Sequence, residues 1–146
     1  MQNKLLINGE LVSGEGAATP VIDPASGATL GTVTEASEAQ VEAAVAAATE
    51  AFESFRKTAP AERAGLLLAL ADAIEAHSDE LAELESQDCG KPFTHARDEE
   101  MPLTIDTFRF MAGAARTQTG SAAGEYVDGF TSMIRKDPIG PVASIA

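Results

Sequence analysis

Alternating apolar and polar positions near the N-terminus predict short β-strands. Residues 5–12 (LLINGELV) place β-forming side chains on both sides of Asn8-Gly9, a dipeptide that accepts the positive φ angles of a type I′ turn. This stretch is therefore predicted to be a tight hairpin. Residues 21–27 form a strand that runs into a turn marked by Asp-Pro and glycine, and residues 30–34 can form the next strand.

After this region the apolar residues recur every three to four positions, which predicts amphipathic helices. The first begins at a capping box made by Ser37 and Gln40 and runs to about Arg56. A second begins at Pro60, because proline is tolerated at the first helical position. The apolar stripe of the first helix consists of Val41, Val45, Ala48, Phe52 and Phe55, and the predicted buried stripe of the second consists of Leu67, Leu70, Ala71 and Ile74.

Two more helices follow in the same pattern. The third begins at Ser78 and is stopped by Gly90 and Pro92. The fourth runs from about Thr94 to Thr117, and Pro102 either kinks it or marks its true start. The positions expected to face inward are Leu81 and Leu84 in the third helix, and Ile105, Phe108, Met111 and Ala115 share one face of the fourth.

The C-terminal part returns to β-forming sequence, with strands predicted at residues 125–128, 131–136 and 142–146. The order of strands, four helices and strands predicts an α/β fold. A last strand that needs neighbours on both sides lies at the end of the chain, which leads us to expect a longer natural protein.

Composition narrows the possible functions of the chain. It has 146 residues, of which 45% are hydrophobic, but alanine is common, tryptophan is absent and there is one tyrosine, so the core should be thin. The net charge of −13 disfavours binding to nucleic acid or to an anionic membrane. Apolar runs at residues 5–7 and 64–71 are too short for a signal peptide or a membrane span. We therefore expect a cytoplasmic protein.

Several short motifs resemble parts of functional sites, but each also has a structural explanation or lacks a residue that the site requires. Gly14-Glu15-Gly16 lacks the third glycine of a dinucleotide fingerprint and does not open a helix, so it is predicted to be a loop. Cys89 lies at a helix C-terminus, where the dipole disfavours a thiolate, and is predicted to be a small buried packing residue. The spacing of His77, Cys89 and His95 matches no zinc site. The acidic run 98–100 either complements a helix dipole on a solvated face or recognises a cationic ligand.

Five segments, taken together, are more specific than any of these motifs. In order and spacing they resemble the N-terminal part of the NAD(P)-dependent aldehyde dehydrogenases, over residues 4–146. The nearest branch oxidises aminoaldehydes such as gamma-aminobutyraldehyde and betaine aldehyde. The segments are Leu6–Glu10, Val21–Gly27, Leu84–Pro92, Phe108–Gly113 and Arg135–Ala143.

The resemblance implies a division of the chain into three parts. Residues 1–124 would form the first part of the cofactor-binding domain, with strands and four helices. Residues 125–140 would form a β-hairpin arm of the oligomerisation type, which leads us to expect a homodimer or homotetramer of the complete protein; an ordinary surface hairpin is the alternative. Residues 141–146 would begin a Rossmann-like nucleotide-binding sheet that continues beyond this chain.

The resemblance also implies a reaction, the oxidation of an aldehyde to a carboxylic acid with NAD or NADP. In the family a cysteine thiolate attacks the carbonyl, hydride passes to the nicotinamide, and a glutamate activates water on the thioester. The oxyanion asparagine follows the strand that matches residues 142–146, so we assign no catalytic and no cofactor-binding residue here, and expect the chain alone to be inactive. The alternative function is a non-catalytic acidic module for interaction or oligomerisation.

Two binding roles fall partly within the chain by resemblance. Many family members hold a monovalent cation through positions that correspond to the Val21 and Ile22 carbonyls and the Asp88 carboxylate, oxygen donors that suit a hard cation. Asp88 could instead bond the local backbone at its helix end. Glu100, beside Glu99, matches an acidic residue that attracts the cationic end of an aminoaldehyde.

Overall fold

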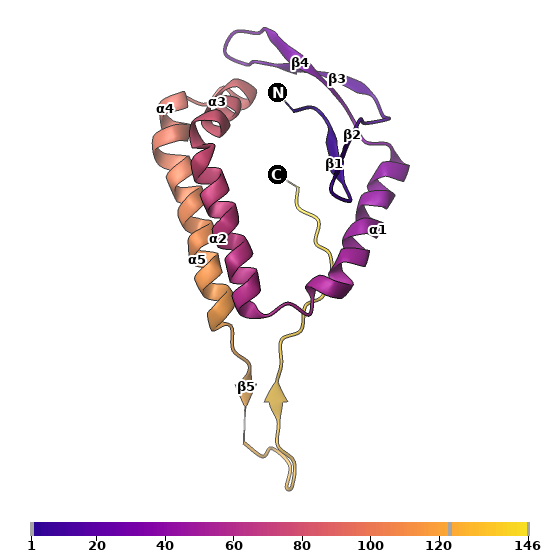
Figure 1. The fold of residues 1–146 in the computed structure, drawn as a ribbon, viewed down its shortest axis with the longest axis vertical. Coiled ribbons are helices and arrows are strands. Elements are labelled where there is room, and N and C mark those ends of the chain that lie inside the picture. The colour runs from indigo at the N-terminus through magenta and orange to yellow at the C-terminus, as the bar shows by residue number, and fades with distance from the viewer. Residues whose placement is uncertain (1, 123, 146) are drawn as a thin grey trace.

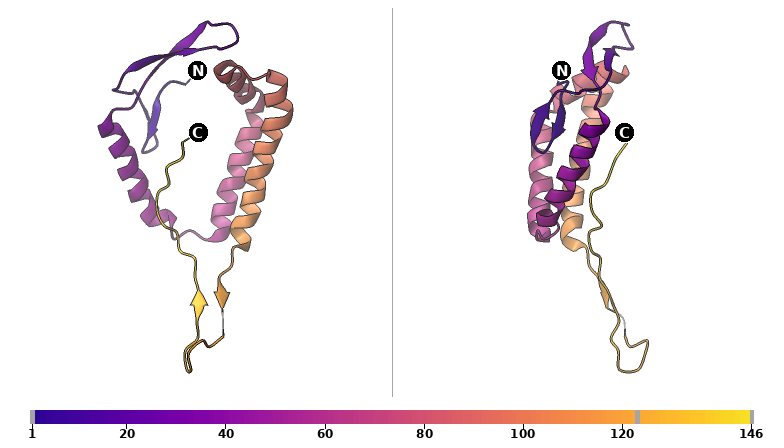
Figure 2. Two further views of the ribbon diagram at one scale, coloured as in Figure 1. Left: turned by 180° about the vertical axis from the view of Figure 1, so that it is seen from behind. Right: turned by 90° about the vertical axis from the view of Figure 1, so that its right-hand side faces the viewer.

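The computed structural model describes residues 2–122 and 124–145 as an open ring of elements with a protruding arm (Figure 1). Helix α1 (Glu38–Phe55) forms one side of the ring, and helices α2 (Pro60–Ala76) and α5 (Met101–Thr117) lie side by side on the other. Seen from the edge, the molecule is narrow (Figure 2). Most elements therefore have neighbours on few sides.

The N-terminal hairpin is formed as its sequence predicts. Strands β1 (Leu5–Ile7) and β2 (Glu10–Val12) pair antiparallel across a two-residue connection. Asn8 has a φ of 52° and Gly9 a φ of 80°, the left-handed values that a type I′ turn requires at both central positions. The Asn-Gly dipeptide thus fixes the register of this hairpin.

A second antiparallel ribbon follows, made of β3 (Ala18–Ile22) and β4 (Thr29–Thr34). The register shifts at a bulge between Val21 and Ile22, immediately before the turn at residues 23–27. The two predicted strands are confirmed, and β3 begins earlier than expected, at Ala18. The bulge and the turn together redirect the chain toward the helices.

Helix α1 begins at the predicted capping box. The backbone N–H of Gln40 donates to Ser37 Oγ at 3.3 Å, and the Ser37 N–H donates to Gln40 Oε1 at 3.1 Å. The apolar stripe that follows stays largely uncovered, with Val41 54% and Val45 56% exposed. The cap therefore defines where this helix starts, but none of the residues of α1 is buried.

Helices α2 and α5 run antiparallel and pack through small residues. Ala64 and Ala71 on α2, and Ile105 and Ala112 on α5, are the buried positions, seven residues apart on each helix. Alanine lets the two axes approach closely. Within the predicted stripe of α2, Ala71 is buried, but Leu70 is 44% exposed, so that prediction is wrong. The helix turns its small side chains, rather than its leucines, toward α5.

The third and fourth predicted helices are also present. Helix α3 (Ser78–Cys89) ends at Gly90, whose φ of 74° gives the expected left-handed cap. The fourth is one helical run made of α4 (Phe93–His95), the π-helical turn η1 (Ala96–Glu100) and α5. Pro102 lies in the first turn of α5, directly after the π turn. Proline has no backbone N–H to donate. The helical hydrogen-bond pattern therefore changes from π to α close to a residue that could not donate a bond in either pattern.

The predicted arm is present, but its strands are short and differently placed. Strand β5 (Ser121–Ala122), for which no strand was predicted, pairs antiparallel with β6 (Met133–Ile134). The predicted strand at residues 125–128 is wrong, because this stretch makes only one bridge, between Val127 and Phe130. A two-stranded ribbon with no sheet beside it has little to hold a longer ladder.

The predicted strand at residues 142–146 is also wrong as far as it is described. Residues 142–145 form no strand, and Ala146 lies outside the described residues. Val142 and Ile145 are almost fully exposed. A strand forms only beside another strand edge, and none of the described segments offers one here.

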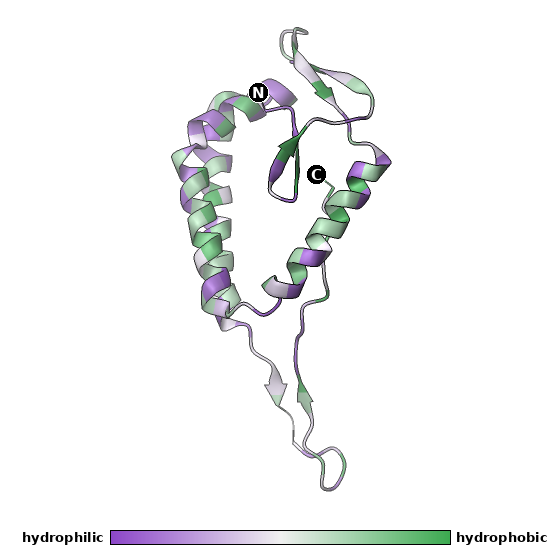
Figure 3. Cartoon of the chain, turned by 45° about the vertical axis from the view of Figure 1, so that its right-hand side comes forward, coloured by the Kyte–Doolittle hydropathy of each residue, from purple (hydrophilic) through white to green (hydrophobic). Residues whose placement is uncertain are grey.

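The described residues build almost no core, as the composition predicted. The accessible surface is 10774 Å², whereas a compact monomer of this mass exposes about 7,100 Å². The six buried hydrophobic residues are five alanines and Ile105. Hydrophobic residues recur along α1 and the α2–α5 pair (Figure 3), and many of their side chains are exposed. None of the described helices is both long and apolar enough to cross a membrane.

Candidate functional site

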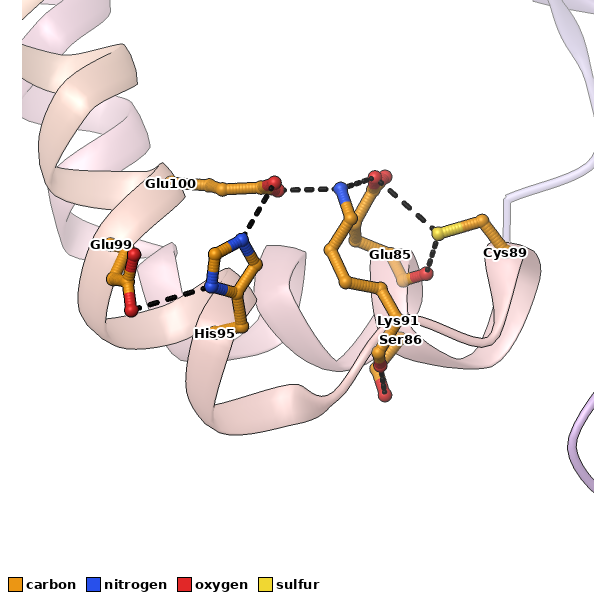
Figure 4. Close-up of polar contacts among 7 residues, drawn as sticks. All are labelled: Glu85, Ser86, Cys89, Lys91, His95, Glu99 and Glu100. Carbon is orange, nitrogen blue, oxygen red and sulfur yellow. Dashed lines mark hydrogen bonds and ion pairs between the residues drawn. The ribbon is translucent and has the colours of Figure 1, made fainter.

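A cluster of charged side chains lies where α3 ends and the fourth helical run begins (Figure 4). The Lys91 ammonium donates to Glu85 Oε1 at 2.7 Å and to Glu100 Oε2 at 2.6 Å. Lys91 and Glu100 are partly shielded, with side chains 26% and 33% exposed. We call Glu85, Lys91, His95, Glu99 and Glu100 the lysine network.

The lysine network shifts the protonation of its members. The Glu100 carboxylate, followed by that of Glu85, raises the pKa of the Lys91 ammonium above its usual value. In return, the hydrogen bond and charge of Lys91 lower the pKa of Glu85. Lys91 is therefore a fixed cation and Glu85 a fixed anion at neutral pH.

His95 extends the network on the side of the π turn. Its Nδ1 lies 3.4 Å from Glu99 Oε1 and its Nε2 lies 3.6 Å from Glu100 Oε1. Asp98, the remaining member of the acidic run, accepts from Arg97 Nε at 2.6 Å. Each carboxylate of the run thus lies beside a basic side chain rather than facing water alone.

Cys89 lies next to the network but does not pack in a core. It is exposed, and its Sγ donates to the Glu85 carbonyl at 3.0 Å. The prediction of a buried packing residue is wrong, because the last turn of α3 lies at the edge of the molecule and the thiol turns back onto its own helix. Among the described residues, no group of three or more His, Cys, Asp or Glu side chains is arranged to hold a metal ion.

Two of the three predicted cation ligands lie at one hollow. Val21 and Asp88 both line a hollow of about 530 Å³ between the β3–β4 ribbon and α3, and Glu85 of the lysine network lines it as well. Ile22 follows Val21 in β3 but is not part of the lining. The remaining lining residues are Gln2, Leu30, Val33, Leu81, Leu84 and Gln87.

The end of α3 packs directly against the turn at residues 23–27. A Cβ on Gly90 would lie 2.8 Å from Pro24 Cγ, so glycine at this position allows the close approach. Asp23 holds that turn, since its carboxylate accepts from the Ala25 N–H at 2.8 Å and from Ser26 Oγ at 2.5 Å. The Ser26 bond, then the Ala25 bond, lowers the pKa of Asp23. Oxygen donors on the turn side and Asp88 on the helix side suit a hard monovalent cation.

Sequence reasoning identified Asp88 and Glu100 but gave Lys91 and His95 no role of their own. Lys91 follows Glu85 by six residues, with the left-handed Gly90 between them, and precedes Glu100 by nine. No helical or strand period relates positions across such a reversal. The one usable indication was the Gly-Lys-Pro sequence directly after a helix end.

The glycines at residues 14–16 are explained by packing rather than by a nucleotide. A Cβ on Gly14 would lie 2.1 Å from the Thr34 carbonyl oxygen, and the Gly16 N–H donates to the Glu35 carbonyl at 2.8 Å. This loop therefore closes on the backbone at the end of β4. Packing against this backbone therefore accounts for both glycines without a nucleotide.

Comparison with known proteins defines the family. The sequence profile of the aldehyde dehydrogenase family matches residues 11–146, and the chain belongs to this family. It is 40% identical over 146 residues to "Aldehyde dehydrogenase, mitochondrial" of Leishmania tarentolae, covering 99% of this chain and 29% of that protein.

Solved structures agree with this assignment. The NAD+ complex of an aldehyde dehydrogenase from Bacillus cereus superposes with a TM-score of 0.84 at 38% identity, covering 91% of this chain and 28% of that one. Betaine aldehyde dehydrogenase from Staphylococcus aureus gives 0.87 at 28% identity, covering 94% and 28%. The chain thus spans under a third of the length of these relatives.

Proposed function

We propose that this chain forms part of an enzyme that oxidises an aldehyde to the carboxylic acid with NAD or NADP as hydride acceptor. The observation that carries the proposal is the family match over residues 11–146. The likeness to an aldehyde dehydrogenase solved with NAD+ supports the choice of cofactor. A cytoplasmic location, expected from the sequence, stays a prediction.

Within such an enzyme we assign this chain a supporting role. Cys89 does not fit the nucleophile, because its thiol donates to a carbonyl at the C-terminal end of a helix. The glycines of the residues 14–16 loop are accounted for by packing, as described above, so we assign this loop no contact with the cofactor. We propose the same three-part division as the sequence indicates, with residues 1–124 as scaffold, 125–140 as arm and 141–146 as the start of the nucleotide-binding sheet.

The test compares the 146-residue chain with the product of the complete coding sequence. The complete protein should reduce NAD+ or NADP+ in the presence of aldehydes, and the isolated chain should not. The chain's uncovered apolar surface should make it self-associate in size-exclusion chromatography. An inactive complete protein, with a monomeric chain that melts cooperatively, would favour the alternative of an acidic interaction module.

We propose that the arm joins subunits into a homodimer or homotetramer. Its apolar side chains are exposed: Tyr126, Val127, Phe130, Met133 and Ile134. Replacing Met133 and Ile134 by Asp should lower the oligomer mass of the complete protein in light scattering. A matched double change on the scaffold, Leu66→Asp with Leu103→Asp, controls for the loss of exposed apolar surface. An unchanged mass in the arm variant contradicts the proposal.

We propose that the Val21 and Ile22 carbonyls and the Asp88 carboxylate contribute to a monovalent cation site. Support comes from the hollow that Val21 and Asp88 share and from the anionic Glu85 on its lining. In the complete protein, K+ or Na+ should raise the melting temperature over an equal concentration of a bulky organic cation. Asp88→Asn should abolish this difference, and Asp79→Asn, at the other end of α3, should leave it intact.

We propose further that the substrate is an aminoaldehyde such as 4-aminobutanal, attracted by Glu100. The Lys91 ammonium pairs with two carboxylates, those of Glu85 and Glu100, and Glu99 adds a third carboxylate beside His95, so the network has more carboxylates than fixed cations and can attract a second cation. The likeness to betaine aldehyde dehydrogenase supports the same class. A carboxylate next to a partly desolvated ammonium contributes about 1–3 kcal/mol.

A kinetic comparison in the complete enzyme tests the aminoaldehyde proposal separately from the general proposal of aldehyde oxidation. Glu100→Gln should raise KM for 4-aminobutanal and leave KM for an uncharged aldehyde of equal length unchanged. Glu99→Gln is the matched control and should have the smaller effect, because Glu99 is the more exposed of the two. An equal effect on both aldehydes would make Glu100 a purely structural partner of Lys91.

A further inference from the structure

Basic side chains gather where the arm leaves the ring, in a chain whose net charge is −13. Two adjoining hollows of about 360 and 350 Å³ lie between the end of α1, the start of α2 and the base of the arm. Arg63, Gln118 and Lys136 line both, so we treat them as one feature, the arm-base hollow. The other charged lining residues are Arg56, Arg135 and Asp137.

The arm-base hollow is cationic even after its own ion pair is counted. Arg135 Nε lies 2.7 Å from Asp137 Oδ1, which neutralises one positive charge. Arg56, Arg63 and Lys136 remain. Arg56 has a carboxylate only at the limit of an ion pair, Glu53 at 4.0 Å, and within the part of the chain that the structure describes neither Arg63 nor Lys136 has one within 4.0 Å.

Both guanidinium groups are held in place before any ligand arrives. The Arg56 guanidinium lies 5.2 Å from the ring centre of Phe52, a cation–π contact. Arg63 Nη1 donates to the Thr58 carbonyl at 2.5 Å and to Thr58 Oγ1 at 3.5 Å. Their rotamers are thus restricted, and binding would cost less side-chain entropy than at freely rotating arginines.

The side chains of Arg56, Arg63 and Lys136 together favour a small ligand that carries several negative charges. A guanidinium offers paired N–H donors in a plane, which match two oxygens of one phosphoryl group. A single carboxylate would neutralise only one of three cations, whereas a diphosphate carries enough charge to meet all three. We propose that the arm-base hollow binds a small phosphorylated anion, recognised through its phosphoryl oxygens by Arg56, Arg63 and Lys136.

The test measures binding of pyrophosphate to the complete protein by equilibrium dialysis at constant ionic strength. Arg56→Gln and Lys136→Gln should each weaken binding about tenfold, the loss typical of one charge-assisted contact. Arg63 is left intact because it also holds Thr58. Lys57→Gln is the matched control: Lys57 is the next residue after Arg56, but it lines a different hollow with Asn8 and Ala47.

The outcomes separate a built site from general charge attraction. Weakening in both hollow variants, with less than about a twofold change in Lys57→Gln, supports the proposal. Equal weakening in all three variants would show attraction to any nearby cation and would overturn it. Citrate at the same ionic strength is the second arm of the test. Citrate bound as tightly as pyrophosphate would overturn the assignment to phosphoryl groups.

Discussion

Helix α1 and the α2–α5 pair show that a helix start and a helix partner are specified by different parts of the sequence. Helix α1 has a complete capping box, yet none of its residues is buried. Helix α2 begins at Ala59 without a side-chain cap, yet buries Ala64 and Ala71 against α5. A cap satisfies free N–H groups locally, whereas burial requires a second element at the right distance.

The two sides also differ in how they use large apolar residues. The α2–α5 contact is made by alanines, and an arginine on its outer side adds to it: Arg109 Nη2 lies 3.2 Å from Asp72 and 2.5 Å from Glu75. The leucines of α2 and the valines of α1 stay exposed. Close packing of small residues brings the two helices together and leaves the large side chains exposed.

The largest expected effect tests this difference directly. Ala71→Leu adds three carbons where the exposed fraction is 0% and should lower the free energy of unfolding by about 1–3 kcal/mol through overpacking. Ala48→Leu makes the same change on the exposed side of α1 and should stay within about 0.5 kcal/mol of the parent. Urea unfolding followed by circular dichroism measures both. Equal losses would mean that the two helices are packed alike.

Much of this fold is predictable because its rules are local. The Asn8-Gly9 turn, the Ser37–Gln40 box, Pro60 and Gly90 all act within a few residues, and each appears as expected. Burial and the C-terminal strands depend on partners distant in sequence or outside the chain. The predictions for Leu70, for Cys89 and for the strands at residues 125–128 and 142–145 therefore failed.

The candidate site divides in the same way. The family resemblance singled out Val21 and Asp88, and the structure places both at one hollow although they are far apart in sequence. Glu85 meets Lys91 only because the left-handed Gly90 reverses the chain between them, and this turn also brings Lys91 to Glu100 of the π turn. Periodicity cannot predict a contact across such a reversal, since it relates only positions within one element.

A second prediction compares a glycine that the packing requires with one that it does not. Gly90 has a φ of 74° and faces Pro24, so Gly90→Ala should destabilise by about 1–2 kcal/mol from the left-handed backbone alone. Gly65 lies within α2 with no atom within 4 Å of an added Cβ. Gly65→Ala should instead stabilise by about 0.5–1 kcal/mol. Opposite signs in urea unfolding are expected; a Gly90→Ala variant as stable as the parent would contradict the left-handed conformation of Gly90.

The smallest expected effect concerns pH and the lysine network. Lys91 lowers the pKa of Glu85 below its ordinary value of 4.5, so this contribution to stability is present above about pH 4.5 and is lost as the pH falls through the folded value. The pKa of Lys91 is raised, so its contribution persists below about pH 10.4 and is lost only at higher pH. Between these two pH limits, the contribution of the lysine network to the free energy of unfolding should not change with pH.

Lys91→Met removes the partner and should return Glu85 to an ordinary titration. The melting temperature of the variant should be lower than that of the parent at neutral pH, and the gap should close on acidification as Glu85 becomes protonated in the parent. Lys57→Met removes the same charge from α1's end, away from the network, and should give a small, pH-independent difference. The Glu85 carboxyl carbon shift, followed by NMR through the acid range, reports the titration itself. If Glu85 in the parent titrates at its ordinary value, the Lys91 ammonium does not stabilise the Glu85 carboxylate. That result would refute the proposed electrostatic link between α3 and the π turn.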